Sequence, residues 1–165
     1  MPTSSSSQAA QRLEAVSAHL SSPTPPKMST PEKKPPITCH VLDTSAGRPA
    51  ASIPVTLTLH NPPSTLSPNP SALTFSGTTN ADGRVTSWTS SSSFSADSLE
   101  AVFKRAGDQK YSLTFDTESY FGEKGVKTFF PEVEVKFVVR DEAKGEHYHV
   151  PVLLSPFGYT TYRGS

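Results

Sequence analysis

The last 19 residues of the chain, 147–165, alternate between apolar and other side chains, and this alternation limits the possible folds more than any other segment does. One parity is apolar throughout: Tyr148, Val150, Val152 and Leu154. Because successive side chains of a strand point to opposite faces, this set faces a core and the residues between them face away from it. Residues 155–158, SPFG, supply a turn, since proline fixes φ and glycine tolerates a positive φ. The segment therefore predicts a strand, a tight turn and a second strand.

Segments with the same period recur upstream. They predict strands over residues 37–43, 53–59, 73–79, 84–88, 111–115 and 133–139, with a further short strand at 100–104. One short helix is predicted over residues 116–125, where Asp116 or Thr117 caps the start and Gly125 ends it. Seven or eight strands joined by turns, with one helix, predict an all-β fold of the β-sandwich type.

The connecting segments carry expectations of their own. Pro54 lacks a backbone donor, which favours an edge position for its strand. Residues 141–146, DEAKGE, are predicted to form a charged hairpin loop that leads into the terminal pair of strands. Residues 60–73 contain four prolines and predict a long loop.

The first 34 residues differ in composition from the rest. They hold serine and proline runs such as residues 21–26, SSPTPP, which cannot bury enough surface to offset the entropy of ordering. Residues 1–34 are therefore predicted to be a disordered extension, and residues 35–165 a single domain. Within the extension, residues 11–20 are good helix formers, with their larger apolar side chains on one helical face: Leu13, Val16 and Leu20.

Charge and cysteine content argue against several classes of function. The 165 residues include 15 basic and 15 acidic side chains, so nothing indicates electrostatic capture of nucleic acid or of an acidic membrane. The single cysteine, Cys39, excludes an intrachain disulfide and favours a reducing or peroxisomal compartment over secretion. No apolar run approaches the roughly 18 residues that a membrane span requires.

Two histidines lie in strands that direct them away from the core. His40 and His149 each occupy the second parity of a strand whose other parity is apolar, and Arg84 directly follows an Asp-Gly turn. The ordinary alternative for such a histidine is a solvated surface position. A zinc site is a second alternative, with His147 and His149 on one strand face and His40 as the third ligand.

The remaining reactive side chains have structural explanations. Asp43 and Asp82 are predicted to shape turns, and Trp88 to be a packing residue. Cys39 has core parity and is expected to be inert. A Ser-His-Asp triad gains no support, because the sequence has no Gly-x-Ser-x-Gly motif.

The residues thus predict a β-sandwich with two histidines, an arginine and a Tyr-Arg terminus on a sheet face that is not the core. Leu42, Leu153 and Tyr162 lie on the same face. A monomer would leave these apolar side chains in water, which suggests that the face meets another subunit.

Three parts of the sequence resemble the transthyretin-related protein family, and in particular its 5-hydroxyisourate hydrolases. They are HVLD and GRPA within residues 40–50, TNADGR at 79–84, and the series FFPEV at 129–133, HYHVP at 147–151 and YRGS at 162–165. The terminal YRGS after LLSP separates the hydrolases from true transthyretins. The loops at 60–73 and 88–110 depart from the family pattern in being longer.

The resemblance implies a transthyretin-like two-sheet β-sandwich that assembles as a homotetramer, a dimer of dimers, with two sites at the dimer–dimer interface. It implies hydrolysis of 5-hydroxyisourate to 2-oxo-4-hydroxy-4-carboxy-5-ureidoimidazoline in urate breakdown, with no metal and no organic cofactor. The family's functional positions fall on His40, Arg84, His149 and the tail formed by Tyr162, Arg163, Gly164 and Ser165.

The chemistry of that reaction needs a base, an acid and a cation. With the resemblance as the guide, His40 and His149 are expected to share water activation and proton transfer, with the division between them open. Arg84 would orient the substrate and stabilise negative charge. Tyr162 would wall the pocket, Arg163 and Gly164 would contact substrate, and Ser165 would assist proton transfer.

Two other functions are compatible with a sandwich of this kind. A non-catalytic transthyretin-like carrier of a small aromatic ligand would need an open and mostly apolar channel, whereas this face presents two histidines, an arginine and a tyrosine. An immunoglobulin-like adhesion module would use its loops and make the histidines incidental. The lack of a disulfide and of a secretion signal argues against the adhesion module.

The extension also carries a short targeting pattern. Arg12-Leu13, five residues and then His19-Leu20 fit the second type of N-terminal peroxisomal signal, which implies a peroxisomal import receptor as a partner. A chance match in a disordered tail is the alternative. Initiation at Met28 would omit the signal and give a cytosolic form.

Overall fold

The computed structural model describes residues 34–62, 72–91 and 98–165. The predicted targeting segment at residues 12–20, the helical face predicted within it and Met28 lie outside the described residues, as does most of the 60–73 loop. The domain boundary predicted after residue 34 therefore stays a prediction. Among the described residues, no helix has the length and hydrophobicity needed to cross a membrane.

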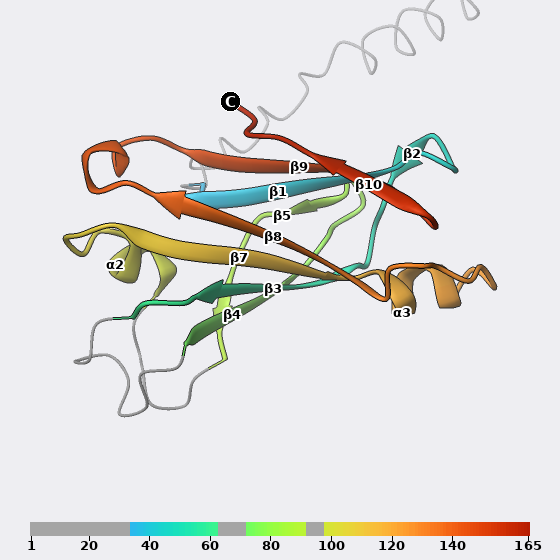
Figure 1. Cartoon of the computed structure of the whole chain (residues 1–165), viewed down its shortest axis with the longest axis horizontal. Coiled ribbons are helices and arrows are strands. Elements are labelled where there is room, and N and C mark those ends of the chain that lie inside the picture. The colour runs from blue at the N-terminus through green and yellow to red at the C-terminus, as the bar shows by residue number, and fades with distance from the viewer. Residues whose placement is uncertain (1–33, 63–71, 92–97) are drawn as a thin grey trace, which may run out of the picture. The chain divides into compact units, whose positions relative to one another are not determined.

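Two five-stranded sheets form the two layers of a sandwich, which confirms the predicted fold class (Figure 1). The first sheet has the order β10-β9-β1-β2, with β5 paired to β1 off this path. Its strands are β1 (Ile37–Asp43), β2 (Arg48–Pro49), β5 (Arg84–Val85), β9 (Tyr148–Ser155) and β10 (Gly158–Thr161). The second sheet has the order β6-β4-β3-β7-β8. Its strands are β3 (Pro54–Leu59), β4 (Leu73–Thr78), β6 (Thr89–Ser90), β7 (Gln109–Asp116) and β8 (Glu132–Val139).

The side-chain parity predicted for the first sheet is confirmed. Along β1, buried residues alternate with half-buried ones, and Ile37, Cys39 and Val41 are fully buried. Along β9 the predicted core set is also buried, from Tyr148 at 7% exposure to Val152 at 1%. The tight turn at 155–158 joins β9 to β10 as an antiparallel hairpin, as predicted.

The strands β1 and β9 lie side by side and run parallel, although more than a hundred residues separate them in the sequence. Their register places Thr38 opposite His149 and His40 opposite Pro151. The face of the first sheet that points away from the core therefore collects residues from both ends of the domain. Sequence periodicity alone could not predict this parallel register.

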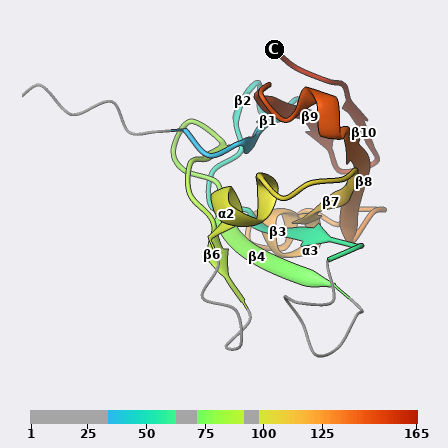
Figure 2. The same ribbon diagram turned by 90° about the vertical axis from the view of Figure 1, so that its left-hand side faces the viewer.

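Two helices close the two ends of the sandwich (Figures 1 and 2). The helix α3 (Thr117–Gly122) confirms the predicted one: the Asp116 side chain accepts the backbone N–H of Ser119 at its start, and Gly125 follows its end with φ of 68°. The second helix, α2 (Leu99–Phe103), occupies the segment predicted as a strand at 100–104, so that prediction is wrong.

The reason for the helix α2 is local. The Ser98 hydroxyl accepts the N–H of Ala101 and caps the first turn. Leu99, Val102 and Phe103 follow helical spacing and are buried, and the ring of Phe103 lies edge-on to Tyr148 with 5.9 Å between centroids. The apolar residues of the segment thus follow a period of 3.6 residues and not the period of two that a strand requires.

Three further expectations about connections are wrong. Pro54 begins β3, which lies between β4 and β7; proline is tolerated there because it is the first residue of the strand. The strand predicted over residues 84–88 ends at Val85, after which the chain crosses to the second sheet and forms β6. Residues 141–146 contain the 3₁₀ turn η1 (Asp141–Ala143) and connect β8 in one sheet to β9 in the other, so they are not a hairpin loop.

Candidate active site

His40 and Arg84 lie opposite each other on paired strands. β1 and β5 run antiparallel, with His40 in register with Arg84. The turn before β5 is fixed by Asn80, whose side-chain oxygen accepts the backbone N–H groups of Asp82 and Arg84 at 3.0 and 2.9 Å. Gly83 has φ of 72°, and a Cβ there would lie 2.4 Å from the carbonyl oxygen of Val41. Only glycine lets this turn approach β1 so closely, and the approach sets Arg84 beside His40.

The second predicted histidine lies on the neighbouring strand and contacts a threonine. Thr38 Oγ1 lies 2.8 Å from Nδ1 of His149 and also 2.8 Å from Nε2 of His147. The two imidazole rings are stacked with their centroids 6.4 Å apart. The hydroxyl of Thr38 therefore joins two imidazoles on the site face. Thr38 shares the parity of His40 along β1, but its sequence context carries no signal that marks it as a site residue.

The C-terminal tail folds back onto β9 and covers His149. After β10 ends at Thr161, the N–H of Gly164 donates to the carbonyl of His149 at 2.9 Å, forming an isolated antiparallel bridge. A Cβ at Gly164 would lie 2.7 Å from Cδ2 of His149 and 3.0 Å from Cγ of Pro151. The absence of a side chain at Gly164 is thus what allows the tail to lie directly against the histidine ring.

The neighbours of Gly164 in the tail differ in their surroundings. Arg163 forms an ion pair with Glu146 and lies over the ring of Tyr148, with 5.3 Å from its guanidinium carbon to the ring centroid. Tyr162 is 59% exposed, and Ser165 is exposed at the end of the chain. The substrate contact expected of Arg163 stays a prediction, since the structure gives its guanidinium a different partner.

The pKa values of the site histidines lie below their ordinary value. Burial and then the charge of Arg84 lower the pKa of His40, while the backbone and charge of Asp82 act in the opposite direction. Burial also lowers the pKa of His149, and the charge of Arg84, the protonated forms of His147 and His40, and the charge of Lys34 act in the same direction. The physical result is a pair of imidazoles held neutral near neutral pH beside a permanent cation.

The alternative chemistries can be weighed against the geometry. Among the described residues, no group of three or more His, Cys, Asp and Glu side chains is arranged to hold a metal ion. Asp43 is buried and accepts hydrogen bonds from Ser45, Ala46 and Tyr120. Burial alone would raise the pKa of Asp43, but these hydrogen bonds hold it below its ordinary value. It shapes its turn, as predicted. Burial raises the pKa of Cys39 to about 12, which agrees with the expected inert thiol.

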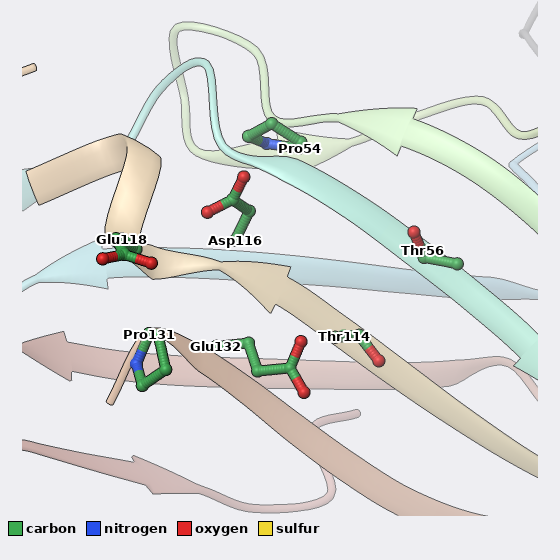
Figure 3. Close-up of a pocket in the computed structure, with 7 residues that line it drawn as sticks. All are labelled: Pro54, Thr56, Thr114, Asp116, Glu118, Pro131 and Glu132. Carbon is green, nitrogen blue, oxygen red and sulfur yellow. The ribbon is translucent and has the colours of Figure 1, made fainter. Parts of the chain in front are cut away.

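A cavity of about 500 Å³ lies elsewhere, at the second sheet near the start of α3 (Figure 3). It is lined by Pro54, Thr56, Thr114, Asp116, Glu118, Pro131 and Glu132. One of its carboxylates has a structural role: Asp116 caps α3 and also accepts a hydrogen bond from the hydroxyl of Ser119 at 2.7 Å. None of the predicted site residues lines it.

The chain is similar to known proteins in both sequence and structure. The sequence pattern of the HIUase/Transthyretin family matches residues 37–164. A probable 5-hydroxyisourate hydrolase of Schizosaccharomyces pombe is 42% identical over 132 residues, which cover 79% of this chain and 92% of that protein. The structure of Klebsiella pneumoniae 5-hydroxyisourate hydrolase matches with a TM-score of 0.54 and 30% identity, over 78% of this chain and 98% of that one.

A related structure without the hydrolase name also matches. Sea bream transthyretin in complex with thyroxine has a TM-score of 0.58 and 25% identity, over 78% of this chain and 94% of that one. The family pattern covers the strands that carry His40, Arg84 and His149. The predicted resemblance is therefore confirmed, and this chain belongs to the HIUase/Transthyretin family.

Proposed function

We propose that this protein hydrolyses 5-hydroxyisourate to 2-oxo-4-hydroxy-4-carboxy-5-ureidoimidazoline, a step of urate breakdown. The named hydrolases among its relatives support the substrate. The observation that carries the proposal is the convergence of His40, Arg84 and His149 on one sheet face, with the terminal tail folded over His149.

The reaction opens a cyclic amide after water adds to the ring carbonyl. A neutral imidazole can accept the proton of the attacking water, and the lowered pKa values of His40 and His149 favour the neutral form. The guanidinium of Arg84 can stabilise the negative charge that develops on the carbonyl oxygen. The proton held by the base then passes to the leaving nitrogen, so water supplies both the hydroxyl of the new carboxyl group and the proton on nitrogen without any external reagent.

The direct test is to follow the ultraviolet absorbance of freshly generated 5-hydroxyisourate with and without the protein. Faster decay with the protein, abolished in the double variant His40→Ala and His149→Ala, supports the activity. Decay at the uncatalysed rate with folded wild-type protein would refute it. Thyroxine, which the sea bream transthyretin structure contains, serves in the same samples as the probe for a carrier.

The sheet edges and the exposed apolar residues support a further proposal, a homotetramer built as a dimer of dimers. Among the described strands, β8 and β10 end their sheets, and each leaves a row of backbone groups for pairing with another copy. On the site face Leu153 is 38% exposed and Tyr162 is 59% exposed. Light scattering should report four chains, and an active monomer would contradict a site shared between subunits.

We also propose import into peroxisomes through Arg12-Leu13 and His19-Leu20. A fusion of residues 1–34 to a fluorescent protein should give punctate fluorescence in cells that becomes diffuse on Leu13→Arg or His19→Asp. Diffuse fluorescence from the unmutated fusion would rule the signal out. The same fusion begun at Met28 provides the matched control for a cytosolic form.

A further inference from the structure

The hydroxyl of Thr38 is placed between two imidazoles. Its oxygen lies 2.8 Å from Nδ1 of His149 and 2.8 Å from Nε2 of His147. A threonine hydroxyl has one proton to donate and lone pairs that accept. It can therefore accept from one ring while it donates to the other, which gives a directed chain of two hydrogen bonds across three side chains.

The contact at Nδ1 decides which nitrogen of His149 can act on water. Because Nδ1 faces Thr38, Nε2 is the nitrogen left to accept a proton from water. For Nε2 to be unprotonated in the neutral ring, Nδ1 must carry the proton and donate it to Thr38. Thr38 then donates to Nε2 of His147, whose own proton lies on Nδ1.

We propose that Thr38 and His147 form a proton relay for His149, an inference that rests on the proposed hydrolysis. As Nε2 of His149 takes a proton from the attacking water, its Nδ1 proton passes to Oγ1 of Thr38. The hydroxyl proton of Thr38 passes at the same time to Nε2 of His147. His147 becomes an imidazolium and releases its Nδ1 proton to solvent.

The second half of the reaction runs the same chain in reverse. Nε2 of His149 gives its proton to the leaving nitrogen, and Nδ1 recovers a proton from Thr38. Thr38 recovers one from Nε2 of His147, and His147 takes one from solvent at Nδ1. Every proton is accounted for, no oxidant or reductant is needed, and the hydrogen-bond directions return to their starting arrangement.

The distribution of charge gives the relay a physical purpose. Burial is the largest influence that lowers the pKa of both rings, and Lys34 acts on both, whereas Arg84 and His40 lower the pKa of His149 alone. His147 is also the more exposed of the two rings. Moving the positive charge from His149 to His147 takes it away from Arg84 and into water, where it is less costly.

The substitution Thr38→Val removes the hydroxyl but keeps a β-branched side chain suited to a strand. We expect kcat to fall on the order of 10- to 100-fold, since a hydrogen bond to a charged group is lost, with KM nearly unchanged. Thr38→Ser should restore most of kcat. Thr56→Val, which removes an exposed threonine hydroxyl from β3 in the second sheet, is the matched control and should retain wild-type turnover.

A double-mutant cycle separates a proton relay from a purely structural contact. If Thr38 and His147 act in one chain, the double variant Thr38→Val with His147→Gln should be no slower than the slower single variant. Full additivity of the two effects, or wild-type kcat in Thr38→Val, would overturn the relay. Circular dichroism checks that each variant is folded.

The protonated nitrogen of His149 can be read without any turnover. Nitrogen–proton correlation NMR of the imidazole should show the proton of neutral His149 on Nδ1 in the wild type and a shift of population toward Nε2 in Thr38→Val. A wild-type ring protonated on Nε2 would contradict the relay even if the protein hydrolyses 5-hydroxyisourate. Loss of the proposed function would instead appear as wild-type protein without activity.

Discussion

Both sheets carry a histidine beside a hydroxyl, and the two pairs differ in what surrounds them. At the second sheet, Nε2 of His60 lies 2.8 Å from Oγ of Ser112. At the first sheet, Nδ1 of His149 lies 2.8 Å from Oγ1 of Thr38. The contact distances are the same, so distance alone does not identify a catalytic group.

Charge separates the two pairs. Glu134 lies next to Ser112, and its carboxylate is 3.2 Å from the ammonium of Lys136. Burial raises the pKa of Glu134. The hydrogen bonds from Lys136 and Ser112, together with the charges of Lys136 and His60, nevertheless hold that pKa below its usual value. The second-sheet pair therefore sits in a balanced group of charges. For His149, burial is the largest influence on the pKa, and the strongest charge that adds to it is the cation of Arg84. A cation beside a neutral imidazole suits a reaction in which negative charge develops.

The largest expected difference is between removing His149 and removing His60. His149→Ala should lower kcat/KM on the order of 100- to 10,000-fold, because a positioned proton-transfer group is lost. His60→Ala should leave turnover essentially unchanged, since its hydroxyl contact lies on the other sheet. Ultraviolet assays of both variants, with thermal melts as the folding control, make the comparison. Equal losses in the two variants would show that the charge environment does not distinguish the sheets.

A substitution at Gly164 tests whether the position of His149 depends on its steric contact with the C-terminal tail. Gly164→Ala places a Cβ within 2.7 Å of Cδ2 of His149 in the present geometry, so the ring or the tail must move. A displacement of about 1 Å at a catalytic group costs roughly 100-fold. Gly122→Ala is the control, because nothing lies within 4 Å of a Cβ built there. Wild-type turnover in Gly164→Ala would mean that the tail does not position His149.

The site could be predicted from the sequence to the extent that it depends on local pattern. The two-residue period gave the outward direction of His40 and His149, and the Asn-Ala-Asp-Gly turn before Arg84 is a local signal that the structure confirms. The contact of Thr38 with His149 depends instead on the register of two parallel strands that are distant in sequence. The side-chain period within each strand carries no information about how the two strands align with each other.

Two other features were missed for related reasons. The helix α2 is short, and its cap and its three buried apolar residues are the only local signals for it. The contact of Arg163 with Glu146 joins the tail to the connection between β8 and β9, whose path depends on the crossing from one sheet to the other. Both were beyond a strand-by-strand interpretation of the sequence.

The charges around His149 also predict a pH dependence for the site on the first sheet. The pKa of His149 is lowered from 6.5, so the neutral base is present at neutral pH and is lost as pH falls through the lower folded value. Between 6.5 and that value the unfolded chain binds more protons than the fold, so stability falls with acidification as well. Arg84→Gln should raise the pKa of His149 and move this loss toward neutral pH.

Imidazole proton NMR titration reads these pKa values directly. The groups that face His149 and must be considered are Arg84, His147, His40 and Lys34. Lys34→Gln is the milder companion variant and should shift the pKa of His149 in the same direction as Arg84→Gln, but less. A pKa of His149 that is unchanged in Arg84→Gln would remove the charge argument that separates the two sheets.

The smallest expected effect concerns how the tail is held. Arg163 is paired with Glu146, but their side chains are 64% and 55% exposed, so the ion pair is screened by water. Exposed pairs contribute about 0.2–1 kcal/mol, and an exposed cation over an aromatic ring adds about 0.5–1 kcal/mol. Glu146→Gln should therefore destabilise the protein only slightly in denaturant unfolding. Arg163→Ala should lower the free energy of unfolding somewhat more, because it also removes the contact with Tyr148.

If the ion pair between Arg163 and Glu146 holds Gly164 against His149, both variants should lower kcat a few-fold. High salt should then lower the kcat of the wild type toward that of the variants. Salt-independent turnover, equal in all three proteins, would show that the bridge from Gly164 to β9 holds the tail without the ion pair.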